Sequence, residues 1–154
     1  MTPARRLRPI LATLAGLAAL APVYYLTEAA ARCLRTAHAA FAPAPAGLAY
    51  LAAVAVIVTL LSVWPAAALG CGVPLTAAGV LFALDLDAAM SLAATLPWAR
   101  AGGLPWSPPD AAPWAELAEP PGTLAGMSGL YALLGALLVL SALPRARRRS
   151  ILDL

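Results

Sequence analysis

The chain has 154 residues, of which 62% are hydrophobic and 11% are charged, and its mean hydropathy is +0.84. An ordinary soluble domain carries about a quarter charged residues, so this composition excludes that class and indicates an integral membrane protein. The net charge of +3 does not indicate nucleic-acid binding, because most arginines lie near the two chain ends, where they flank apolar runs as topology signals do.

Four apolar runs approach or exceed the roughly 20 helical residues that cross the hydrocarbon of a bilayer. They cover residues 10–26, 48–69, 75–96 and 123–143. We therefore predict an all-α membrane protein, a four-span transmembrane helix bundle that forms a single integral membrane domain over residues 1–154. All ten basic residues are arginine and alanine is abundant, which is typical of a GC-rich bacterial genome.

The first run follows three arginines, and a cleaved signal peptide is a competing interpretation of this end. Pro22 lies directly after the small residues of the candidate cleavage site and disfavours cleavage, which would leave three spans. The outer segment 27–47 begins with good helix formers, and Glu28, Arg32 and Arg35 share one helical face. We interpret its first part as an interfacial helix or as an extension of the first span.

The uncharged segment Gly70–Pro74 predicts a tight hairpin between the second and third spans, on the cytoplasmic side. Pro74 would then begin the third span, since proline is favoured in the first helical turn. Asp85 lies eleven residues later, roughly 16 Å along a helix and near the membrane midplane.

Asp85 and Asp87 are two positions apart, so on one continuous helix they point in nearly opposite directions, about 200° apart. A shared two-carboxylate site would need a break in the helix. At a comparable depth we predict hydroxyl partners at Thr59 and Tyr131. No basic residue lies at that depth, which favours the neutral acid for both aspartates.

Three interpretations of the aspartates remain open. They could make interhelical hydrogen bonds only, pair with a residue that another membrane protein supplies, or handle protons or cations in a small transporter. A metal-dependent membrane transferase is a further interpretation of the D-x-D pattern, but it needs more acidic and basic residues than the spans carry.

The second outer segment, 97–122, is rich in proline and carries three tryptophans. Trp98, Trp106 and Trp114 are interfacial anchors or, alternatively, a candidate surface for a ligand or partner. Four arginines follow Pro144, which ends the fourth run. With three arginines before the first span and four after the last, the positive-inside rule places both termini in the cytoplasm.

We predict a multi-pass protein of the cell (plasma) membrane, with the lipid bilayer as its environment. Its expected role is an accessory or structural subunit of a membrane assembly, in which another membrane protein could supply a partner for Asp85 or Asp87. A proton- or cation-coupled transporter using Asp85 or Asp87 is the alternative, and a membrane-embedded transferase is third. No cofactor and no catalytic or metal site are expected, because the chain has a single histidine, His38, and no C-x-x-C motif.

Overall fold

The computed structural model describes residues 3–96 and 120–152, with side chains placed for residues 8–96 and 120–143, and it consists of helices joined by short turns. No strand occurs in these ranges. Six helices follow one another in the described residues: α1 (Pro3–Ala39), α2 (Pro45–Ser62), α3 (Pro65–Leu84), α4 (Leu86–Ala94), α5 (Thr123–Met127) and α6 (Leu130–Leu152).

Three of these helices are long and apolar enough to cross a membrane. The qualifying stretches are Arg8–Ala39 of α1, and the whole of α2 and α3. In α6, the part whose side chains are described, Leu130–Leu143, is a shorter apolar helix. The prediction of an all-α helix bundle is thereby confirmed, and three helices of this length and apolarity are typical of a membrane protein.

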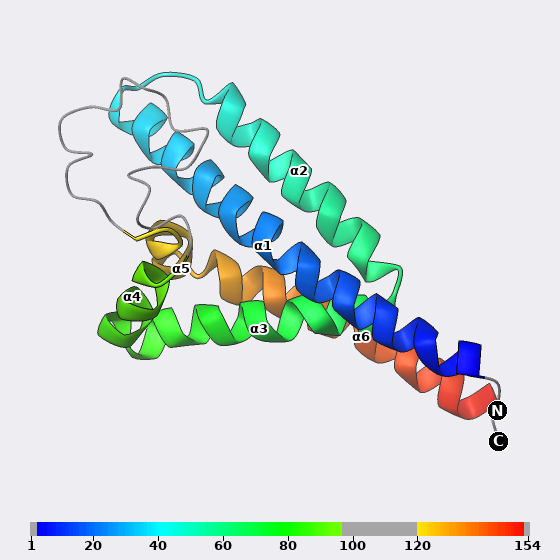
Figure 1. Ribbon diagram of the computed structural model, residues 1–154. Coiled ribbons are helices and arrows are strands. Elements are labelled where there is room, and N and C mark those ends of the chain that lie inside the picture. Colours follow the sequence, from blue (N-terminus) through cyan, green and yellow to red (C-terminus); the bar gives the residue numbers. More distant parts are fainter. Residues whose placement is uncertain (1–2, 97–119, 153–154) are drawn as a thin grey trace.

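Helix α3 packs against each of the other five helices described, most extensively against α6 and α1. It packs antiparallel to α6, since Gly72 lies against Leu138 while Gly79 lies against Ala132. It crosses α1 where Gly16 meets Ala67. Helix α2 packs mainly against α1, and Figure 1 shows it diverging from α3 and α6. The start of α1 and the end of α6 lie at one end of the molecule, and α4 and α5 lie at the other.

Close approach of these helices depends on glycine. A Cβ atom added at Gly79 would overlap the backbone of Ala132, and one added at Gly135 would overlap Thr76. Small residues at helix crossings let backbones approach and gain van der Waals contact where lipid provides no hydrophobic driving force. The contact between α3 and α6 is therefore specified by glycines on both helices.

The predicted hairpin at Gly70–Pro74 is wrong, because these residues lie inside α3. The turn between the second and third helices is at Val63 and Trp64, and Pro65 takes the first position of α3. Trp64 is extended, with φ −111° and ψ 108°, as the residue before a proline prefers. The glycines of the predicted turn serve packing instead: Gly70 lies against Thr13 of α1, and Gly72 against α6.

The other predicted helix limits change as well. The run 48–69 is split at the turn before Pro65, and the run 75–96 is split at Asp85 between α3 and α4. The run 123–143 is divided into α5 and α6 at Ser128 and Gly129, because Gly129 has a positive φ of 75°. Helix α6 continues past Pro144 instead of ending there. Helix α1 continues without interruption to Ala39, so the segment after the first run begins as an extension of that helix.

Candidate functional site

A fully buried carboxylate, Glu28 of α1, joins α1 to α5. Its Oε1 accepts a hydrogen bond from Nε of Arg32 at 2.7 Å, and its Oε2 accepts one from the backbone N–H of Ala125 at 3.0 Å. Arg32 is one helical turn further along α1, so the regular helix by itself places the two side chains together. A buried carboxylate is tolerated only when it is paired and hydrogen-bonded, and both conditions are met here.

Two tyrosines extend this connection. The hydroxyl of Tyr24 donates to the carbonyl oxygen of Pro121 at 2.8 Å, and the hydroxyl of Tyr131 donates to the carbonyl oxygen of Tyr24 at 3.1 Å. Their rings are stacked with centroids 4.6 Å apart. Arg32 also reaches the carbonyl oxygen of Pro120 at 3.4 Å. We call Tyr24, Glu28, Arg32 and Tyr131 the α1–α5 clamp, because they hold the chain from Pro120 to Ala125 against α1.

The turn that enters the clamp requires a glycine. Gly122 has φ +97°, and a Cβ atom there would overlap the hydroxyl of Tyr24. L-amino acids with a side chain rarely adopt this conformation. The local sequence Pro120-Pro121-Gly122 therefore provides both the carbonyl acceptors and the tight turn that presents them to α1.

The chemistry of the clamp is structural. Both oxygens of Glu28 are occupied by donors, one of them a backbone amide that cannot move independently of α5. In the part of the chain that the structure describes, no three metal-ligating side chains lie together. The arrangement can hold the end of an outer segment in place, whereas a general base needs an oxygen that can reach a substrate proton.

The structure places Asp85 at the junction of α3 and α4, with extended backbone angles of φ −145° and ψ 91°. Its Oδ1 accepts a hydrogen bond from the backbone N–H of Ala88 at 3.0 Å, so Asp85 is the N-cap of α4. Asp87 lies in the first turn of α4, and both side chains are exposed. The helix is thus broken next to the two acids. The sequence predicts one continuous third span, without this break.

The predicted hydroxyl partners lie elsewhere. Thr59 donates to the carbonyl oxygen of Ala55 within α2 at 2.7 Å. It is close to the turn before Pro65, and Asp85 follows the 20-residue helix α3, about 30 Å long at 1.5 Å per residue. Tyr131 is fully buried and belongs to the α1–α5 clamp. The four predicted residues do not form one site. Trp98, Trp106 and Trp114 lie outside the described residues.

The sequence contained a signal for the clamp that the prediction used only in part. Glu28 and Arg32 were placed on one helical face, but an acid inside the run from Val23 to Ala31 also indicates a buried partner. The contact with Ala125 could not be inferred in the same way, because it joins residues 97 positions apart.

Comparison of the chain with protein-family models, with curated proteins and with solved structures gives no match.

Proposed function

We propose that this protein is an accessory or structural subunit of an assembly in the cell (plasma) membrane, with four spans and both termini in the cytoplasm. The spans would be formed by α1, α2, α3 and α6, with α5 leading into the last of them. Successive helices of this set alternate in direction, and the arginine-rich ends of α1 and α6 lie at the same end of the molecule (Figure 1). This arrangement supports the orientation that the positive-inside rule favours.

The main observation in support of the proposed role is that two acidic side chains, Glu28 and Asp85, already accept hydrogen bonds that stabilise the fold. Glu28 is saturated by Arg32 and Ala125, and Asp85 caps α4. Proton and cation pathways need ionisable groups within the membrane-spanning helices that face a cavity or exchange partners. Across Pro9–Thr27, α2, α3 and Leu130–Leu143, the sequence has no charged residue.

Large apolar side chains remain exposed on several helices, as an accessory membrane protein requires for contact with lipid and with partner helices. On α2 these include Leu48, Val56 and Leu60, and on α6 Leu133, Leu137 and Leu140, each more than half exposed. Because α2 packs mainly on α1, its outer face is available for such contacts.

One observation favours the transporter as a second candidate. Broken helices with polar groups at the break occur at the binding sites of many transporters, and the chain breaks next to Asp85 and Asp87. The break follows a full-length apolar helix, however, so it lies at the end of α3 instead of at its middle. The accessory role is therefore favoured.

Reconstitution separates the two functions. Wild-type protein and the variant carrying Asp85→Asn and Asp87→Asn would be placed in liposomes, and fluxes driven by pH and cation gradients compared with protein-free liposomes. For an accessory subunit we expect no flux from either protein.

A parallel measurement uses chemical crosslinking in native membranes before extraction. We expect a discrete crosslinked species of wild-type protein. The double variant should stay inserted, because asparagine can still cap α4, but it should lose the crosslinked species, because the exposed carboxylates that would meet the partner are gone. A pH-dependent flux that is present in wild type and lost in the double variant would instead establish the transporter.

A further inference from the structure

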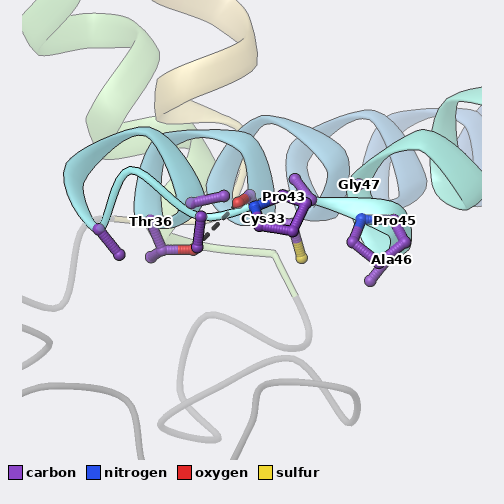
Figure 2. Close-up of a pocket in the computed structure, with 10 residues that line it drawn as sticks. Cys33, Thr36, Pro43, Pro45, Ala46 and Gly47 are labelled. Atoms are coloured by element: carbon purple, nitrogen blue, oxygen red, sulfur yellow. Dashed lines mark hydrogen bonds between the residues drawn. The ribbon is translucent and has the colours of Figure 1, made fainter.

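An apolar recess opens between the end of α1 and the start of α2 (Figure 2). It is shallow and wide open to its surroundings, with a volume of about 360 Å³. Apart from Cys33 and Thr36, the lining consists of alanine, proline and glycine. The hydroxyl of Thr36 lies within hydrogen-bonding distance of the carbonyl oxygens of Arg32 and Cys33. The recess thus suits an apolar occupant.

Phe41, in the turn between α1 and α2, gives a second indication that this region contacts another molecule. It terminates α1 in a Schellman arrangement, in which the N–H of Ala42 donates to the carbonyl oxygen of Ala37 at 2.9 Å. The residue at this position is usually glycine, yet Phe41 has φ +49° and is 99% exposed. A phenylalanine that adopts a disfavoured conformation and is fully exposed, between the lining residues Ala40 and Ala42, indicates contact with an apolar medium.

The position of the turn identifies that medium. Helix α2 begins at Pro45, only four residues after Phe41, and is apolar over its whole length. If α2 crosses the membrane, as the proposed function holds, the recess and Phe41 lie at the boundary between headgroups and acyl chains. Arg32 is paired with Glu28, but Arg35 and His38 follow it with exposed side chains, and no acid occurs between residues 29 and 50. A guanidinium group such as that of Arg35 binds phosphate well.

We propose that the recess binds one acyl chain of an anionic phospholipid, with the headgroup at the basic end of α1 and Phe41 inserted beside it. This inference depends on the membrane-spanning arrangement in the proposed function. It adds a specific lipid site, formed by two helices of this chain, to the general contact of the apolar faces with the bilayer.

Photocrosslinking tests the lipid site. The probe is phosphatidylglycerol with a diazirine in its acyl chain, in vesicles of phosphatidylethanolamine and phosphatidylglycerol, and the labelled residues are mapped by mass spectrometry. Ala37→Phe and Ala40→Phe fill the recess from two positions. Ala39→Phe is the matched control, since Ala39 is an exposed neighbour outside the lining.

We expect wild type and Ala39→Phe to carry label at residues 33–47, and both filling variants to lose most of it. Label at residues 56–60, on the outer face of α2, should be the same in all four proteins because it reports general lipid contact. It also tests insertion independently: no label there contradicts the membrane-spanning arrangement, whereas label there but not at 33–47 overturns only the lipid site.

Three further results would overturn the proposal. One is equal labelling of 33–47 in the filling variants and wild type. Another is labelling that appears only after Trp98, Trp106 and Trp114 are changed to alanine, which would assign the recess to the chain's own outer segment. The third is labelling of 33–47 that falls as protein density in the vesicles rises, which would assign the recess to a second copy.

Discussion

At Glu28, a carboxylate without solvent exposure is stabilised by donors from two different parts of the chain. Arg32 would neutralise the charge even in an isolated helix, but the Ala125 amide is present only when α5 is in place. The residue therefore couples the local structure of α1 to the return of the chain toward α6.

Glu28→Ala should destabilise the folded protein strongly. Removing one partner of a buried pair typically costs about 3–5 kcal/mol of folding free energy. The cost here should be smaller than that, because Arg32 is about one-third exposed and water can solvate its charge when Glu28 is removed. Glu28→Gln keeps an acceptor for the Ala125 amide and should cost less. The measurement is the melting temperature in mild detergent, with Asp87→Asn as the control that leaves it unchanged. Equal melting temperatures for Glu28→Ala and Asp87→Asn would contradict the role of the clamp.

Asp85 is an N-cap, so its substitution should follow capping chemistry. Replacing an aspartate N-cap by alanine typically costs about 1 kcal/mol, whereas Asp85→Ser retains an oxygen that can accept from the Ala88 amide. We expect Asp85→Ala to lower the melting temperature and Asp85→Ser to restore most of it. If instead Asp85→Ala raised stability, as removal of a midplane acid would, the N-cap assignment would be wrong.

Among the elements, α3 shows how glycine and proline can have two meanings. Proline at the first helical position is tolerated because its missing N–H would have no partner there, and both Pro65 and Pro74 carry this signal. Glycine marks turns, but in membrane helices it also permits close packing. Because Gly70 contacts α1 and Gly72 contacts α6, these glycines serve close packing and not a turn.

The packing of α3 against α6 should not tolerate a side chain at Gly79. Because a Cβ atom there overlaps backbone of α6 and not a flexible side chain, α6 must shift as a whole. Overpacking of this kind typically costs about 1–3 kcal/mol or more. Gly79→Val should therefore lower the melting temperature substantially, and Ala77→Val, at an exposed position on the same helix, should not. Similar melting temperatures for the two variants would contradict the close contact.

For the molecule as a whole, the alternation of α1, α2, α3 and α6 places the two short turns at opposite ends. The turn around Ala42 lies away from the arginine-rich termini, and the turn at Val63 lies toward them (Figure 1). If the termini are cytoplasmic, these turns face opposite sides of the membrane.

Cysteine labelling tests this topology. In a background with Cys33→Ala and Cys71→Ala, single cysteines would be introduced by Ala42→Cys and Val63→Cys, both at exposed positions. A membrane-impermeant maleimide added to spheroplasts should label Ala42→Cys directly and Val63→Cys only after permeabilisation. Labelling of Val63→Cys in intact spheroplasts would overturn the proposed orientation.

The sequence alone determined the class of the protein and its helical content, because hydropathy and length are properties of continuous segments. It also placed Glu28 and Arg32 on one face of a helix, since their separation of four residues makes them neighbours wherever that helix forms. Both features depend on local spacing and needed no knowledge of the partner helices.

Only the tertiary structure decided which glycines and prolines turn the chain and which pack inside a helix, because that depends on the helix lying opposite. It moved Asp85 from the middle of a predicted span to the cap of α4, and Tyr131 from a predicted aspartate partner to the clamp. It also joined Glu28 to Ala125, a contact that exists only when α5 is packed against α1. The physical reason is the same in each case: burial and hydrogen-bond partners are set by contacts between distant segments, which the periodicity of a single segment does not encode.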